Sequence, residues 1–217
     1  TYLHLIPKNK RYRMLNWRLK SMHYSISLFV YYFGTKKRYT DSVLQHHNMM
    51  MVEDYRQYMR ELFHGKAIPE GLFLYLHMPT RTDPSIAPEG KELFYVLALV
   101  PNLRVDADWK AIGPGYRDRI IDFLEEKYLP GLRENIEVDH YIDPFHFRDT
   151  LNSHKGAGFA TTPVLSQTAY LRPLNKSKRY DDLYFVGAGT HPGAGVPAVI
   201  SSGKIAADLI ESSIQNR

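Results

Sequence analysis

The sequence has no cysteine among its 217 residues, which excludes structural disulfides, thiolate-ligated metal centres and thiol catalysis. No run reaches the roughly 18 apolar residues of a membrane-spanning helix. Three motifs are also missing: the G-x-S-x-G elbow of serine hydrolases, the H-E-x-x-H zinc motif and the G-x-G-x-x-G dinucleotide turn. No metal site is predicted, because the 10 histidines lack ligand spacing and the adjacent pair His46 and His47 cannot easily ligate together from one regular element.

Positive charge is concentrated near the start of the chain, within a formal net charge of +5. Such a cluster fits an anionic membrane surface or nucleic acid, and a solvated basic face is the third interpretation. The aromatic residues, 13% of the chain, lie on apolar stretches rather than between basic residues. This favours core packing or the wall of an apolar tunnel over base stacking, so no nucleic-acid partner is predicted. The basic residues are Lys8, Lys10, Arg11, Arg13, Arg18, Lys20, Lys36, Lys37 and Arg38.

The hydrophobic content of 44% and the charged content of 24% are typical of a globular protein with one large or two small domains. Apolar runs and alternation predict strands over residues 24–33, 72–78, 92–100 and 136–142. The strands over 72–78 and 92–100 are expected to pair antiparallel. Helices are predicted over 52–63 and 115–129, with a short one opened by Asp143 and Pro144. The predicted fold class is α/β, in the mixed α+β sense, with a mixed sheet flanked by helices.

The stretch near the end of the chain carries the strongest functional signal. Residues 183–186 predict a buried strand, residues 187–195 a glycine-rich turn, and the apolar spacing after it a helix. In this geometry, backbone N–H groups at the helix N-terminus can approach a phosphate or another electron-rich group. An ordinary tight turn between a strand and a helix is the alternative. Because the dinucleotide fingerprint is absent, we interpret the turn as one that closes over a cofactor held elsewhere, with His191 in position to face it.

The same stretch resembles the C-terminal signature of the bacterial-type carotenoid (phytoene) desaturases, a family of FAD-dependent oxidoreductases. The resemblance covers most of the chain from about residue 24 onward. It is carried by residues 75–90 (YLHMPTRTDPSIAPEG), 95–101 (YVLALVP), 129–132 (LPGL), 150–154 (TLNSH), 163–173 (PVLSQTAYLRP) and 183–197 (LYFVGAGTHPGAGVP).

The resemblance implies an FAD-linked oxidoreductase fold of which this chain is roughly the C-terminal half. Residues 1–165 would be a substrate-binding region and residues 166–217 the return to the FAD-binding domain. The family's reaction removes hydrogen beside a conjugated polyene, with FAD taking the hydride and a phytoene-like carotene as substrate. The residues implied to bind the cofactor are Gly187, Ala188, Gly189, Thr190, His191, Gly195, Val196 and Pro197.

The chain departs from the family pattern at two places, and its catalytic residue is not assigned. The G-x-G-x-x-G turn of an N-terminal FAD-binding half is missing, so the chain by itself is expected to be inactive, and Ala198 stands where the family has glycine. No catalytic residue is assigned; His191, Asp149 and Arg148 are candidates for handling a proton. The rival hypotheses are a carotenoid isomerase or carotene oxygenase on the same scaffold, and a non-catalytic module that binds an apolar ligand or a membrane.

A membrane-soluble substrate would require the protein to dock on a bilayer. The resemblance therefore favours the membrane interpretation of the basic residues. The expected location is cytoplasmic, peripheral on the inner face of the cell membrane, in contact with anionic lipid.

Overall fold

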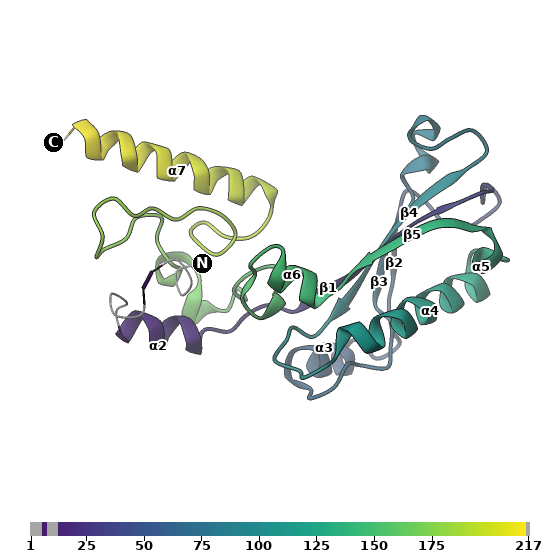
Figure 1. Ribbon diagram of the computed structural model, residues 1–217, viewed down its shortest axis with the longest axis horizontal. Helices are drawn as coiled ribbons and strands as arrows, with labels where there is room; N and C mark the ends of the chain where they lie inside the picture. Colours follow the sequence, from purple (N-terminus) through teal and green to yellow (C-terminus); the bar gives the residue numbers. More distant parts are fainter. Residues whose placement is uncertain (1–5, 8–12, 216–217) are drawn as a thin grey trace. The chain divides into compact units, whose positions relative to one another are not determined.

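The computed structural model describes residues 6–7 and 13–215 (Figure 1). Lys8, Lys10 and Arg11 of the basic segment lie outside the described residues. The chain divides into two compact units, which we call the sheet unit (Ile26–Gly156) and the terminal unit (Thr1–Ser25 with Ala157–Arg217). The division into a substrate-binding region and an FAD-domain return at residue 165 is a statement about roles, and it stays a prediction.

The sheet unit is built on five strands in the spatial order β2-β3-β4-β1-β5. All four pairings are antiparallel, so the α/β class is confirmed, while the sheet is antiparallel rather than mixed. The four strands predicted over residues 24–33, 72–78, 92–100 and 136–142 are present, and 72–78 with 92–100 pair antiparallel as expected. The strands are β1 (Ser27–Thr35), β2 (His47–Met50), β3 (Leu74–His77), β4 (Glu92–Val100) and β5 (Ile136–Ile142).

One face of the sheet is buried under the long helix α4 (Trp109–Lys127), which runs along the strands in Figure 1. Alternate residues of β1 and β4 point to this face, and Phe29 packs its ring against Trp109 and Tyr116 at centroid distances of 5.8 and 4.9 Å. The helix begins six residues before the predicted start at residue 115. Asp108 caps it by accepting a hydrogen bond from the Lys110 N–H.

The opposite face of the sheet is covered only in part. Helix α3 (Tyr55–His64) packs Tyr58 and Leu62 against Phe73 and Ile26, while Phe147 of α6 (Pro144–Asp149) covers one end of β1. The Asp143 cap of α6 is confirmed, since its carboxylate accepts from the His146 N–H at 3.0 Å. Shorter elements complete the unit: η2 (Pro79–Arg81), η3 (Pro84–Ile86), α5 (Leu132–Asn135) and η4 (His154–Gly156).

The terminal unit joins segments from both ends of the sequence. It holds α2 (Arg13–Ser21), η5 (Leu165–Gln167), η6 (Ala169–Leu171) and α7 (Val196–Gln215). The Arg18 guanidinium donates to the Leu171 carbonyl at 2.5 Å, and the buried Gln167 amide donates to the His23 carbonyl at 2.6 Å. The helix predicted after the glycine-rich turn is confirmed as α7, whose Ser202 and Ala206 are buried.

The strand predicted over residues 183–186 is wrong. The segment makes one isolated antiparallel bridge, between Lys176 and Tyr184, and Val186 is 62% exposed. A strand requires a neighbour that continues the hydrogen-bond ladder. Within the described residues no neighbour extends this ladder beyond the one bridge, so four consecutive apolar residues remain an extended segment.

Candidate functional site

The glycine-rich turn has the backbone conformation that only glycine adopts easily. Gly187, Gly193 and Gly195 have φ values of +104°, +147° and +103°. An L side chain at these angles is strained, so the turn itself accounts for these three glycines. It ends at α7, where the Gly195 carbonyl accepts from the Val199 N–H at 2.9 Å.

A buried polar network fixes the inner side of the turn. The Ser202 hydroxyl accepts from the Gly187 N–H at 2.9 Å and lies 3.0 Å from the Thr190 hydroxyl. The Asn175 amide donates to Ser202 Oγ at 3.1 Å and to the Phe185 carbonyl at 3.1 Å. Buried polar groups that are mutually hydrogen-bonded hold one geometry, so this network sets the path of the turn before any ligand arrives.

Arg172 holds the same turn from another direction. Its buried guanidinium donates to the carbonyls of Ala188, at 2.5 Å, and Thr190, at 2.7 Å. Burial lowers the pKa of Arg172, because the charged form is desolvated. Both of these partners are backbone carbonyls, so the guanidinium is a clamp on the turn.

The outer side of the turn is open in the part of the chain that the structure describes. Gly189 has no left-handed φ, and a Cβ built on it would meet nothing within 4 Å, so the described fold does not require glycine there. Gly203, inside α7, is equally open. Glycine in a helix interior costs about 1 kcal/mol relative to alanine. Packing within the described fold does not explain Gly203, which is suited instead to close contact with another surface.

One face of α7 is apolar and exposed. Its residues recur at helical spacing, and two of them, Val196 and Ile200, are 74% and 68% exposed. The complete stripe is Val196, Ile200, Gly203, Ala207, Ile210 and Ile214. An exposed apolar stripe with small residues at its centre is suited to close packing against another surface.

The N-terminus of α7 adds an electrostatic feature. The first N–H groups of an α-helix have no partner inside the helix and carry the positive end of its dipole. The first turn of α7 contains no acidic side chain to offset that end. Together with the open Gly189 backbone, this arrangement fits an anionic or electron-rich cofactor group approaching from outside.

The predicted cofactor residues divide into two groups. Gly187, Ala188, Gly189, Gly195, Val196 and Pro197 form the turn and the helix start. Thr190 and His191 are more internal: the Thr190 hydroxyl donates to the Gly187 carbonyl at 3.0 Å, and the His191 N–H donates to the Pro173 carbonyl at 3.0 Å. The Thr190 hydroxyl is therefore engaged in holding the turn.

Arg148 and Asp149 lie in α6 of the sheet unit, whereas His191 lies in the terminal unit. Arg148 and Asp149 form an exposed ion pair, with Arg148 Nε 2.6 Å from Asp149 Oδ1. The hydrogen bond to Arg148 lowers the pKa of Asp149, and the same bond raises the pKa of Arg148. Both groups are charged at neutral pH, and their role in handling a proton stays a prediction.

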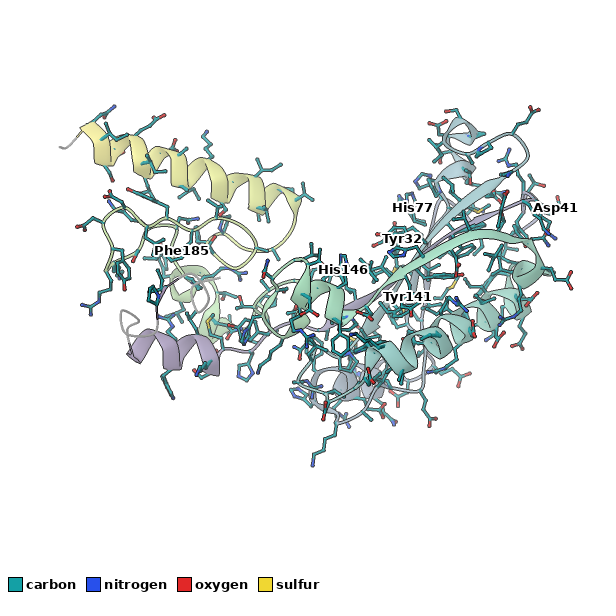
Figure 2. All side chains as sticks on the ribbon, in the orientation of Figure 1. Tyr32, Asp41, His77, Tyr141, His146 and Phe185 are labelled. Atoms are coloured by element: carbon teal, nitrogen blue, oxygen red, sulfur yellow. The ribbon has the colours of Figure 1, made fainter. Side chains whose placement is uncertain are left out.

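A second candidate surface is the partly covered face of the sheet. Cross-strand partners place two rows of side chains across all five strands. One row is His47, His77, Tyr95, Tyr32 and His140, and the other is Met49, Tyr75, Leu97, Val30 and Ile142. We call Tyr32, Tyr75, Tyr95, Met49 and Leu97 the tyrosine face; Tyr32 and His77 are labelled in Figure 2.

The tyrosine face is accessible and aromatic. Met49 is 59% and Tyr32 is 42% exposed, and the Tyr95 ring lies 5.2 Å from Tyr32 and 6.0 Å from Tyr75. Sequence analysis placed aromatic residues on apolar strands but could not tell which formed an exposed surface. The structure separates the two faces: in β4, residues alternate between buried and half-buried, although the sequence of this strand is an almost continuous apolar run.

The amino-acid sequence of the chain is similar to those of known bacterial enzymes. The chain is 47% identical over 197 residues to a lycopene-forming phytoene desaturase of Pseudescherichia vulneris, covering 90% of this chain and 39% of that protein. It is a homologue of the bacterial phytoene desaturases. A second lycopene-forming phytoene desaturase, from Pantoea ananas, is 43% identical over 97% of this chain and 42% of its own length. A neurosporene-forming phytoene desaturase of Rhodobacter capsulatus is 41% identical over 97% and 41%.

The chain thus spans about two fifths of the length of its desaturase relatives, and it corresponds to their C-terminal part. No protein-family model matches it. A solved oxidoreductase structure from Methanosarcina mazei covers 94% of this chain and 38% of its own at 13% identity, with a TM-score of 0.44. So weak a likeness supports no fold assignment.

Proposed function

We propose that the chain is the C-terminal part of an FAD-dependent carotene desaturase that introduces C=C bonds into a phytoene-like substrate. The observation that carries the proposal is the identity of 41–47% to three phytoene desaturases over at least 90% of the chain. The buried network and the open outer side of the glycine-rich turn support it, because they fit a site that another part of the protein completes.

In this proposal the turn and α7 serve the cofactor. FAD, when bound, supplies the acceptor for hydride. The backbone of residues 187–190 would hold the phosphates and the ribityl chain, and Gly189 would leave room for close contact. The N–H groups in the first turn of α7 would favour negative charge on a flavin held there. Arg172 and Asn175 are positioning residues that hold this backbone in place.

The tyrosine face is the part of the sheet unit that we assign to substrate. A polyene has no polar groups along its chain, so its recognition depends on apolar area and on shape. Tyrosine and methionine side chains supply a broad apolar contact surface on a rigid sheet. The face therefore acts as one wall of a binding tunnel and aligns the hydrocarbon for hydride transfer.

Membrane contact belongs to the same proposal. In the terminal unit Trp17 and Tyr170 are 70% and 95% exposed, and their segments are tied together by the bond from Arg18 to Leu171. Exposed aromatic residues beside cations such as Lys20 are typical of interfacial contact with anionic lipid. Within the described residues, no helix has the length and apolarity to cross a membrane. We propose a cytoplasmic protein bound peripherally to the inner face of the cell membrane.

The full-length protein tests the function directly. Expressed in cells that accumulate phytoene, it should deplete phytoene and yield a more unsaturated carotene, and the purified protein should show flavin absorbance. A protein that purifies and reconstitutes without flavin would refute the redox assignment. Unchanged phytoene together with conversion of another carotene would favour an isomerase or oxygenase instead.

A further inference from the structure

Three histidines meet at the edge of the sheet, away from the glycine-rich turn. His47 opens the edge strand β2 and is the cross-strand partner of His77, which ends β3. His46 precedes β2 in a bend, so the strand alternation that sends neighbours to opposite faces does not apply to it. All three side chains therefore reach one place. We call His46, His47 and His77 the histidine cluster.

The ring nitrogens of the histidine cluster are close enough to share one ion. One ligand atom from each residue lies within 4.8 Å of the others. His46 Nε2 and His77 Nε2 are 2.8 Å apart, and the His47 ring centroid lies 4.3 and 5.0 Å from those of His46 and His77. Two nitrogens that bind one tetrahedral ion at about 2.0–2.1 Å are roughly 3.3 Å apart. An opening of roughly 0.5 Å between the first pair would thus admit a metal.

Neighbouring hydroxyls orient two of the rings. His46 Nδ1 lies 2.5 Å from the Thr82 hydroxyl, and His47 Nδ1 lies 2.7 Å from the Tyr75 hydroxyl. Metal-binding histidines commonly engage their second nitrogen in this way, which fixes the tautomer and aims the first nitrogen at the ion. Both contacts use Nδ1 and so leave Nε2 for a metal.

The charge state also suits a ligand set. Burial and the neighbouring rings of His46 and His47 lower the pKa of His77. A neutral imidazole carries the lone pair that a metal requires. An ion would also separate the two facing nitrogens that otherwise share a single proton.

We propose that His46, His47 and His77 bind one divalent transition-metal ion, such as Zn²⁺, with a fourth position left for water. Imidazole nitrogens favour zinc, nickel and copper over magnesium and calcium, which prefer oxygen ligands. The ion would join the edge strand β2 to β3 beside Tyr75 and Tyr95 of the tyrosine face. The site does not depend on the proposed desaturase function, and the two succeed or fail separately.

The test is a metal titration of the full-length protein after removal of bound ions with a chelator. Zn²⁺ is added in competition with a chromophoric chelator, and Co²⁺ substitution reports coordination through its visible absorption. We expect one saturable Zn²⁺ site, with no displacement by Mg²⁺. A protein that takes up no stoichiometric Zn²⁺ overturns the proposal.

Matched variants locate the site. His77→Gln and His46→Gln should weaken Zn²⁺ binding by more than about 100-fold, and Thr82→Val, which removes only the orienting hydroxyl, by about 10- to 100-fold. His140→Gln is the control, because His140 lies in the same cross-strand row on the other edge strand and should leave affinity unchanged. Equal effects of His77→Gln and His140→Gln would overturn the assignment. Zn²⁺ should raise the unfolding temperature of the wild type but not of His77→Gln, and circular dichroism without metal confirms that the variants fold.

Discussion

Gly189→Ala separates what the glycine-rich turn needs for folding from what it needs for its ligand. A Cβ at Gly189 meets no atom within 4 Å, and the residue has no left-handed φ. The substitution should therefore keep the fold, and it should raise the free energy of unfolding by about 0.4–1 kcal/mol, because alanine has less conformational freedom in the unfolded chain. Gly187→Ala should instead destabilise by about 1 kcal/mol or more, since its φ is +104°.

FAD affinity should fall in Gly189→Ala, although the stability of the fold rises. If the turn approaches FAD through its backbone, the added methyl group at residue 189 prevents one charge-assisted N–H contact. Such a bond contributes about 1.5–3 kcal/mol, so FAD affinity should fall roughly 10- to 150-fold. The assay is titration of full-length apoprotein followed by flavin fluorescence, with thermal unfolding of the same apoprotein.

Gly115→Ala is the matched control for Gly189→Ala. Gly115 is also open, but it lies in α4 of the sheet unit, where alanine should add about 1 kcal/mol of stability and leave FAD affinity unchanged. The reasoning is refuted if Gly189→Ala binds FAD like the wild type. It is equally refuted if Gly189→Ala unfolds in the absence of FAD, since the described fold has room for the methyl group.

Three further outcomes follow from the structure. Arg172→Met should lower the free energy of unfolding by about 2–3 kcal/mol in chemical denaturation, and FAD affinity with it, because the carbonyls of Ala188 and Thr190 lose a charged donor; stability equal to the wild type would contradict the clamp. Met49→Lys on the tyrosine face should reduce carotene conversion more than about tenfold, as a charge must be desolvated against the polyene, whereas Val43→Lys, at a 75% exposed position, should not. Asp149→Asn should leave the pH profile of activity near neutrality unchanged, because the lowered pKa of Asp149 keeps it ionised there and any stability from its pairing is lost only as the pH falls through that value; an inflection near neutrality that is lost or shifted in the variant would support a proton-handling role for Asp149.

The sequence predicted elements best where a single periodicity dominated. The strand over residues 92–100 has the observed bounds of β4, since its alternate residues are buried under α4. The start of α4 was missed because Gly113, Pro114 and Gly115 predict a break. Gly113 is instead required by packing, as a Cβ there would lie 2.9 Å from the Tyr141 hydroxyl. The strand β2 carried no apolar alternation, so only its pairing with β3 reveals it.

The sequence predicted where the candidate site lies, but not the hydrogen bonds that hold the glycine-rich turn in place. Glycine density indicated the turn, and the resemblance indicated its ligand, but neither could show that Arg172 and Asn175 hold it from positions 15 or more residues away. Long-range hydrogen bonds leave no periodic trace in a sequence. The same limit applies to His77, whose partners His46 and His47 are brought near by strand pairing rather than by ligand spacing.

The failed strand over residues 183–186 and the exposed stripe of α7 have one physical explanation. Both are apolar and partly exposed among the described residues: Val186 of the segment is 62% exposed, and Val196 and Ile200 of the stripe are 74% and 68% exposed. A chain that spans two fifths of its relatives contains such surfaces when the rest of the protein supplies the neighbouring strand and the facing surface. Gly189 and Gly203 agree with this, because each preserves space that the described fold leaves open. The inner side of the turn is therefore held by hydrogen bonds within this chain, and we propose that its open outer side packs against a part of a longer protein.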